Sequence, residues 1–238
     1  MEQDIQIQSF NEMAVYISLG HTISPRIQRQ VRAVSAYIES HPFAGYKECV
    51  VSYTAVTILY DPYIVRIKEK ADSAQQFVQA YAKQAVQHGD TDSLPPSRDV
   101  TIPVCYGGDY GPDLEEVAKR LNMTPEEVVR IHTSGTYLVY MIGFCPGYPY
   151  MGGLDKRLWI PRRQTPRLAI PARSVAIAGQ QAGIYPMETP GGWHLLGLSA
   201  VDLFTPDADT PSLLQAGDTV HFKAITEEEY KQMRGDRP

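Results

Sequence analysis

Hydrophobic residues in the first part of the chain follow two periodicities. Between residues 25 and 39 they recur every three or four positions, on one face of a helix that Ser24 and Pro25 begin. A second helix is expected from Ser73, with Gln76 as its capping partner. Short runs rich in β-branched and aromatic residues predict strands at residues 5–7, 13–19, 48–53 and 55–60. The pattern predicts a small α+β domain over residues 1–95, with helices packed on a mainly antiparallel sheet.

A polar, turn-rich stretch at residues 88–97 separates this region from one that is mainly β. Two short helices are expected to start at Asp113 and Thr124, each with a Glu three residues later as a capping partner. Strands are predicted at residues 100–106, 137–142, 174–178, 194–198 and 219–223. Short strands separated by turns predict a barrel or a sandwich over residues 96–238. The charged tail after Glu227 is expected to fray.

Composition and charge exclude several classes of protein. The 238 residues are 43% hydrophobic and 21% charged, which is typical of a soluble globular protein. A net charge of -5 argues against nucleic-acid binding, which needs a basic face. No apolar run approaches the roughly 20 residues needed to cross a bilayer, and the first ten residues do not resemble a signal peptide. Three cysteines without paired spacing indicate a reducing cytoplasm.

The stretch from Gly143 to Trp193 has the most unusual composition, because Gly, Pro, aromatic residues and Arg recur throughout it. Gly allows backbone angles that other residues avoid, whereas Pro fixes φ. The composition therefore predicts tight turns between short strands. Aromatic and Arg side chains among such turns form a rigid, partly open surface, and we expect the functional site here.

The charged and aromatic side chains of this stretch each have two interpretations. Arg can bind a carboxylate or phosphate through two parallel hydrogen bonds, so an anionic ligand or an acidic partner surface is one hypothesis. A solvated surface is the alternative for most of the arginines. The aromatic residues are either core or anchors of an interface. These two sets are Arg157, Arg162, Arg163, Arg167 and Arg173, and Tyr148, Tyr150, Trp159, Tyr185 and Trp193.

Other candidates for chemistry are weaker. His132 ends a predicted helix just before the barrel, where it is either a catalytic group or a structural contact to the last helical carbonyls. Cys145 has no histidine nearby in the sequence to activate it, so we interpret it as an inert apolar residue. The scattered His and Cys residues lack metal-site spacing, which predicts no metal. The Gly107–Gly111 turn lacks the phosphate-binding GxxxxGK[ST] pattern.

An ordered series of motifs resembles one protein family. The motifs are PVCYGGDYGPDLEEVA from Pro103, then GFCPGYPYMGGLD, PRRQTPR, IPARSVAIAG, GIYP and TPGGW. They are similar to those of the B-subunit family of 5-oxoprolinase, which includes KipI-type inhibitors of a sporulation histidine kinase. A related domain occurs in allophanate hydrolase subunit 1. The resemblance implies an α+β N-terminal domain followed by a mainly β, cyclophilin-like barrel domain.

The resemblance also implies a function. Together with A and C subunits, such a protein helps to convert 5-oxo-L-proline into L-glutamate, and the complex uses ATP. The chain alone is expected to be inactive, because a lactam is unreactive until its carbonyl is activated and this sequence shows no recognisable phosphate cradle. The alternative is inhibition of a sensor histidine kinase through its dimerisation domain, and one protein can do both.

These observations lead to one set of candidate site residues. His132 is the catalytic candidate. Two departures from the common family pattern, Ala182 for Thr and His194 for Gln, favour a regulatory emphasis if those positions contact the ligand; a third is Arg173 for Gly. The candidate residues for binding substrate or partner are Phe144, Pro146, Tyr148, Tyr150, Arg162, Arg167, Gln181, Tyr185 and Trp193.

Overall fold

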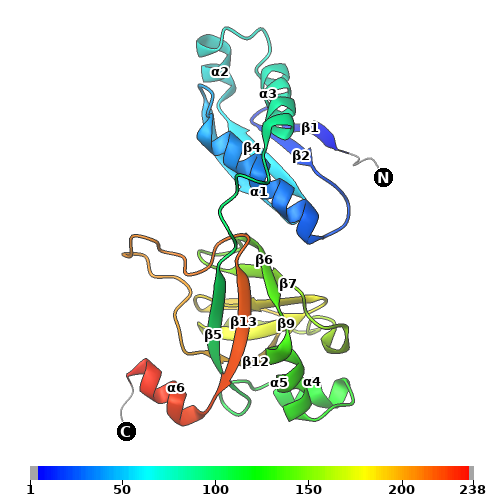
Figure 1. Cartoon of the computed structure of the whole chain (residues 1–238), viewed down its shortest axis with the longest axis vertical. Coiled ribbons are helices and arrows are strands. Elements are labelled where there is room, and N and C mark those ends of the chain that lie inside the picture. Colours follow the sequence, from blue (N-terminus) through cyan, green and yellow to red (C-terminus); the bar gives the residue numbers. More distant parts are fainter. Residues whose placement is uncertain (1–4, 236–238) are drawn as a thin grey trace. The chain divides into compact units, whose positions relative to one another are not determined.

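The computed structural model describes residues 5–235, which form two compact units (Figure 1). The boundary between the units falls between Pro96 and Ser97. Each unit has a hydrophobic core of its own. The domain ranges expected from the sequence also include residues 1–4 and 236–238, which lie outside the described residues.

The first unit is a four-stranded antiparallel sheet, in the order β1-β2-β4-β3, with helices. Apolar residues of α1, α2 and α3 share one core with those of β2 and β4. The Ser24 hydroxyl accepts a hydrogen bond from the Ile27 amide, which begins α1 as predicted. The seven-residue helix α2, capped by Asp61, was not predicted. The elements are β1 (Gln6–Asn11), β2 (Ala14–Ser18), α1 (Pro25–Ser40), β3 (Tyr46–Val51), β4 (Ala55–Tyr60), α2 (Pro62–Lys68) and α3 (Ala74–His88).

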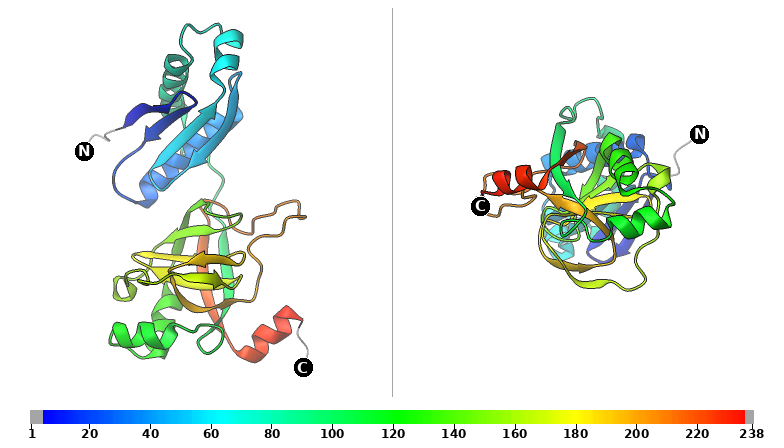
Figure 2. Two further views of the ribbon diagram at one scale, coloured as in Figure 1. Left: turned by 180° about the vertical axis from the view of Figure 1, so that it is seen from behind. Right: turned by 90° about the horizontal axis from the view of Figure 1, so that it is seen from below.

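The second unit is built on a closed seven-stranded barrel, so the predicted barrel is confirmed. Around the barrel the order is β10-β7-β6-β13-β5-β12-β9, and β8 pairs with β11 in a separate small sheet. Figures 1 and 2 show α4 and α5 side by side at one end of the barrel. The strands are β5 (Asp99–Tyr106), β6 (Tyr137–Ile142), β7 (Pro149–Gly152), β8 (Arg167–Ile170), β9 (Ser174–Ala178), β10 (Gln181–Ile184), β11 (Thr189–Gly191), β12 (His194–Ser199) and β13 (Thr219–Ile225). The helices are α4 (Leu114–Arg120), α5 (Pro125–Ser134), a 3₁₀ turn (Lys156–Leu158) and α6 (Glu227–Arg234).

Two sequence predictions about this unit are wrong. The tail does not fray directly after Glu227, because Thr226 and Glu229 form a capping box for α6 and the buried Tyr230 packs against Tyr110, 4.9 Å between ring centres. Asp113 precedes α4, but its side chain makes no capping hydrogen bond. The carboxylate of Asp113 is bound elsewhere, as described below.

Three further properties concern the part of the chain that the structure describes. No helix between residues 5 and 235 is both long and apolar enough to cross a bilayer. No three His, Cys, Asp or Glu side chains within that range gather in a group that could hold a metal ion. Cys49, Cys105 and Cys145 are free thiols.

The chain passes very close to Thr136, the residue before β6, at one glycine of the barrel. Gly153 follows β7 with φ of 104°, and a Cβ there would lie 2.3 Å from the carbonyl oxygen of Thr136. We expect Gly153→Ala to lower the free energy of unfolding by about 3 kcal/mol, because a strained backbone and a steric clash combine. Urea unfolding followed by tryptophan fluorescence measures this, since both tryptophans, Trp159 and Trp193, lie in the barrel unit.

The matched control is Gly108→Ala. Gly108 also has a positive φ, 51°, but a Cβ there would meet no atom within 4 Å. The control should lose about 1 kcal/mol, the cost of a left-handed conformation for alanine. Equal losses in the two variants would contradict the close approach at Thr136.

Candidate functional site

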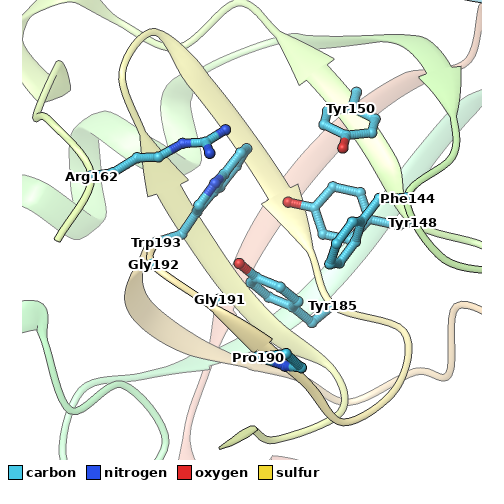
Figure 3. Close-up of a pocket in the computed structure, with 9 residues that line it drawn as sticks. All are labelled: Phe144, Tyr148, Tyr150, Arg162, Tyr185, Pro190, Gly191, Gly192 and Trp193. Atoms are coloured by element: carbon cyan, nitrogen blue, oxygen red, sulfur yellow. The ribbon is translucent and has the colours of Figure 1, made fainter. Parts of the chain in front are cut away.

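A small pocket lies in the barrel unit, within the segment rich in glycine and aromatic residues (Figure 3). Its volume is about 130 Å³, the space of about four water molecules at roughly 30 Å³ each. Pockets for drug-sized ligands are larger, about 300–1,000 Å³. The pocket therefore suits a single small ring. Its lining residues are Phe144, Tyr148, Tyr150, Arg162, Tyr185, Pro190, Gly191, Gly192 and Trp193.

Tyr148 is the centre of the aromatic wall. Its ring makes edge-to-face contacts with Tyr150 and Tyr185, at 5.0 and 5.2 Å between centroids, and with Trp193 at 6.0 Å. Such pairs each contribute about 0.5–1.5 kcal/mol beyond the burial of their area. Figure 3 shows the hydroxyl groups of Tyr148, Tyr150 and Tyr185 directed toward the space between these rings and Arg162. The wall is thus rigid and carries several hydroxyl groups.

Two glycines leave room for these hydroxyl groups. A Cβ on Gly183 would lie 2.5 Å from the Tyr148 hydroxyl oxygen, and a Cβ on Gly191 would lie 2.6 Å from that of Tyr185. Both distances are shorter than a van der Waals contact, so any side chain at either position would displace a tyrosine. The glycines of this segment therefore set the positions of polar groups in the pocket, in addition to forming turns.

Two tyrosines of the pocket, Tyr150 and Tyr185, remain protonated at neutral pH. Burial raises the pKa of Tyr185 to about 12, although the Arg162 guanidinium acts in the opposite direction. Burial likewise raises the pKa of Tyr150 above its ordinary value, again against a smaller effect of Arg162. A neutral phenol can both donate and accept a hydrogen bond. Because no carboxylate lines the pocket, Arg162 is the one charged group among its described lining residues.

The structure separates the five clustered arginines into two kinds. Among residues 5–235, no carboxylate lies within ion-pairing distance of Arg162, whose guanidinium carbon instead lies 5.9 Å from the Trp193 ring centre. Arg162 is therefore the arginine of this cluster that is available to an anion. The other four are paired: Arg157 with Asp155, Arg163 and Arg167 with Asp113, and Arg173 with Asp202.

Asp113 holds the segment that carries Arg162. The buried carboxylate accepts hydrogen bonds from both terminal nitrogens of Arg167, at 2.9 and 2.6 Å, and from Arg163 at 3.1 Å. It also accepts one from the backbone amide of Leu195 in β12, at 2.7 Å. Burial acts to raise the pKa of Asp113, but the hydrogen bonds from Arg167 and Leu195 outweigh it and keep the pKa below the ordinary value. The carboxylate is therefore ionised at neutral pH.

Backbone contacts fix both neighbours of Arg162. The Nε2 atom of the buried His194 lies 2.9 Å from the carbonyl oxygen of Pro161. The amide of Arg163 donates to the carbonyl oxygen of Gly192 at 2.8 Å. With Asp113 holding the side chain of Arg163, the chain on either side of Arg162 is anchored. Little conformational entropy therefore remains to be lost from this backbone when a ligand binds.

Phe144 forms an exposed rim of the pocket in an unusual conformation. Its φ is 65°, in the left-handed region that favours glycine, and its side chain is 62% exposed. Its ring meets Tyr148 edge-on at 5.5 Å. Strained residues of this kind persist where the surroundings hold them, and they cluster at binding sites.

Comparison with known proteins identifies the family. Residues 5–214 match the family described as carboxyltransferase domain, subdomain C and D. The chain is 45% identical over 227 residues to the 5-oxoprolinase B subunit of Bacillus subtilis (strain 168), covering 94% of this chain and 95% of that protein. The chain belongs to the B-subunit family of 5-oxoprolinase. The 5-oxoprolinase B subunit of Haemophilus influenzae is 39% identical over 218 residues, which is 92% of this chain and 97% of that protein.

A solved structure shares the fold with this member of the family. The crystal structure of TTHA0988 superposes with a TM-score of 0.76 at 35% sequence identity. The match covers 89% of this chain but 39% of TTHA0988, so this chain corresponds to part of that longer protein.

The pocket brings together six of the nine residues expected from the sequence to bind a substrate or partner. Pro146 is exposed and Gln181 begins β10, and neither lines the pocket. Arg167 is bound to Asp113 and does not line it either. The sequence did not point to three lining residues, Pro190, Gly191 and Gly192, although they lie in the TPGGW motif. It also did not point to the role of Asp113, which lies in the PVCYGGDYGPDLEEVA motif. The six are Phe144, Tyr148, Tyr150, Arg162, Tyr185 and Trp193.

His132, the catalytic candidate, does not line the pocket. Its imidazole is fully buried, with Nδ1 2.8 Å from the Tyr106 hydroxyl and the Phe222 ring 4.5 Å away between centroids. Burial lowers the pKa of His132 to about 3, so the ring is neutral at physiological pH. These contacts favour a structural role in the barrel core, made through Tyr106 and Phe222 rather than through the last helical carbonyls.

The other residues singled out from the sequence also have structural surroundings. Burial raises the pKa of the Cys145 thiol, which fits an inert residue. Ala182 and His194 are fully buried and do not line the pocket, so their departure from the family pattern does not change its lining. Arg173 has φ of 68°, which explains why glycine suits that position.

Removal of the Asp113 charge tests its role in holding the arginine segment. We expect Asp113→Asn to lower the free energy of unfolding by about 3 kcal/mol at pH 7, because the partly buried Arg167 loses its carboxylate and Arg163 keeps only its pair with Glu116. The pKa of Asp113 is depressed in the folded state, so its contribution is present above the unfolded-state value of about 3.9. The difference between wild type and variant should shrink as the pH falls below about 4, measured by urea unfolding.

Asp202→Asn is the matched control. Asp202 also pairs with two arginines, Arg173 and Arg234, but its side chain is 53% exposed. Solvent screening limits such pairs to about 0–1 kcal/mol. A loss at Asp202 as large as that at Asp113 would contradict the importance of the buried carboxylate.

Proposed function

We propose that this chain is the B subunit of an ATP-dependent 5-oxoprolinase and that it helps A and C subunits to convert 5-oxo-L-proline into L-glutamate. The observation that carries the proposal is the 45% identity to the 5-oxoprolinase B subunit of Bacillus subtilis, over 94% of this chain and 95% of that one. Coverage this complete in both directions supports an equivalent role, because neither protein has a large region without a counterpart in the other.

The reaction explains why a complex is needed. A lactam carbonyl is a poor electrophile. Transfer of the terminal phosphoryl group of ATP to the lactam oxygen would yield ADP and an activated ring carbon. Water then adds to that carbon, and the carbon–nitrogen bond breaks as nitrogen takes up a proton, which leaves an acyl phosphate. A second water attacks the acyl carbon, and phosphate leaves to give the carboxylate. Phosphoryl transfer requires positioned cations around the phosphates.

We assign ATP binding to the partner subunits. The pocket volume of about 130 Å³ is too small for a nucleotide, and the pocket lining includes one cation. The role left to this chain is to hold the small-molecule substrate, an intermediate or a partner surface while the phosphoryl chemistry proceeds elsewhere in the complex. The same division makes the chain inactive by itself.

Two further expectations accompany this role. The three free thiols fit a cytoplasmic location, where the compartment is reducing. Inhibition of a sensor histidine kinase through its dimerisation domain stays a prediction from the family resemblance. It is tested by adding the purified chain to a kinase autophosphorylation assay, in which an unchanged rate at saturating protein rejects it.

Reconstitution tests the proposed enzymatic role. Purified A and C subunits should release L-glutamate from 5-oxo-L-proline and ATP when this chain is present, and at least about tenfold less without it, because each component supplies part of the site. An Arg157→Gln variant of this chain is the control and should restore glutamate release as wild type does, since Arg157 pairs with Asp155 and does not line the pocket. Full glutamate release without this chain would rule out the role.

A further inference from the structure

We propose that the pocket of Figure 3 is a complete binding site for the cyclic substrate: a small five-membered lactam that carries a carboxylate, with the carboxylate on Arg162. The identity of the ring as 5-oxo-L-proline rests on the proposed function. The existence of a site for a small cyclic carboxylate rests on the geometry of this chain.

Charge is the first argument. The pocket lining carries one guanidinium and no carboxylate, so its electrostatic field favours an anion. Arg162 has no carboxylate within ion-pairing distance among residues 5–235, whereas its four neighbours in the cluster are neutralised. The planar guanidinium can bind a carboxylate through two parallel hydrogen bonds. A ligand carboxylate thus replaces the partner that Arg162 lacks.

Size and hydrogen bonding select the rest of the ligand. A volume of about 130 Å³ accepts one small ring with its substituents. The rings of Tyr148, Tyr185 and Trp193 form an apolar wall on which a flat ring can pack. A lactam has one carbonyl acceptor and one N–H donor, and the neutral hydroxyls of Tyr150 and Tyr185 can complement both, since a phenol donates and accepts.

Preorganisation supports binding to this chain without its partners. Asp113 binds the side chains of Arg163 and Arg167, and backbone contacts hold Pro161 and Arg163 on either side of Arg162. Gly183 and Gly191 leave the tyrosine hydroxyls in place. A site whose parts are already ordered loses little entropy on binding, so even a ligand of a few atoms can bind measurably.

A wider groove of about 520 Å³ shares Arg162 with the pocket and is the rival location for an anion. Its other arginines are Arg120 and Arg163, and both pair with Glu116. The groove therefore offers little unpaired positive charge beyond Arg162, and no aromatic residue lines it. An anion without a ring gains nothing from the aromatic wall of the pocket and can bind in the groove instead. Inorganic phosphate, which is such an anion, therefore distinguishes the two locations.

Calorimetric titration of the full chain tests the proposal with three probes. 5-Oxo-L-proline should bind at one site per chain. 2-Pyrrolidinone, the same ring without the carboxylate, and inorganic phosphate, an anion without the ring, should each bind at least about tenfold more weakly, or about 1.4 kcal/mol. Absence of saturable binding by 5-oxo-L-proline overturns the proposal, and so does binding of phosphate with equal affinity.

Variants locate the binding to Arg162. Arg162→Gln should weaken binding of 5-oxo-L-proline at least about tenfold, and Arg162→Lys should fall between, because it keeps the charge and loses the two-pronged geometry. Arg157→Gln, in the same segment but outside the pocket, should bind as wild type does. Arg162 is exposed, so its variants should unfold at the wild-type urea midpoint. Unchanged affinity in Arg162→Gln overturns the proposal.

The outcomes separate this proposal from the proposed function. A chain that restores glutamate release but binds no 5-oxo-L-proline overturns the pocket assignment and leaves the role in the complex intact. The opposite result is that the chain binds 5-oxo-L-proline through Arg162, but the A and C subunits release glutamate equally well without it. That result overturns the role in the complex and leaves the pocket assignment intact. If Arg162→Gln abolishes capture of the A and C subunits while wild type fails to bind the lactam, the pocket receives a partner's side chain and the small-molecule assignment is wrong.

Discussion

The buried carboxylate of Asp113 is the contact on which the candidate site depends. It joins the start of α4, strand β12 and the arginine segment through four hydrogen bonds, from Leu195, Arg163 and Arg167. A buried carboxylate is expensive to leave without partners, so the charges of Arg163 and Arg167 are committed to it. The result is a segment in which Arg163 and Arg167 are neutralised and held, whereas Arg162 has no carboxylate within ion-pairing distance among residues 5–235.

The same segment shows why glycine and aromatic residues occur together. An aromatic wall packs well without help, but its hydroxyl groups need space that a β-carbon would fill. Gly183 and Gly191 supply that space at Tyr148 and Tyr185, where a Cβ would come within 2.6 Å of a hydroxyl oxygen. The composition that indicated turns therefore also determines the polar lining. Phe144 adds a rim at the cost of an unfavourable φ, which the turn around it sustains.

Sequence patterns predicted the elements with strong periodicity and missed those without it. Helix α1, with its apolar face and Ser24 cap, and the strands of the barrel that hold five or more residues are present as expected. Strands β7, β8, β10 and β11 have three or four residues each and contain Gly or Pro or adjoin them, so they showed no alternation. Asp113 fits a capping pattern locally, but contacts to Arg163 and Arg167, about 50 residues away in the sequence, determine its role. Pairing between residues distant in the sequence cannot be inferred from spacing. This pairing is what distinguishes Arg167, which binds Asp113, from Arg162, which binds no carboxylate among residues 5–235.

The ion pairs of the arginines also bear on how the chemistry can be divided between the subunits of a complex. Phosphoryl transfer needs several cations near the phosphates, yet in this part of the barrel unit Arg120, Arg163 and Arg167 are bound to Asp113 or Glu116. One unpaired guanidinium is enough to orient a carboxylate and too few to stabilise a triphosphate. Under the proposed function, this chain positions a small ring, and cations on another chain activate it. Its contribution to the rate would then be orientation of the substrate, which acts through proximity rather than through a catalytic group of its own.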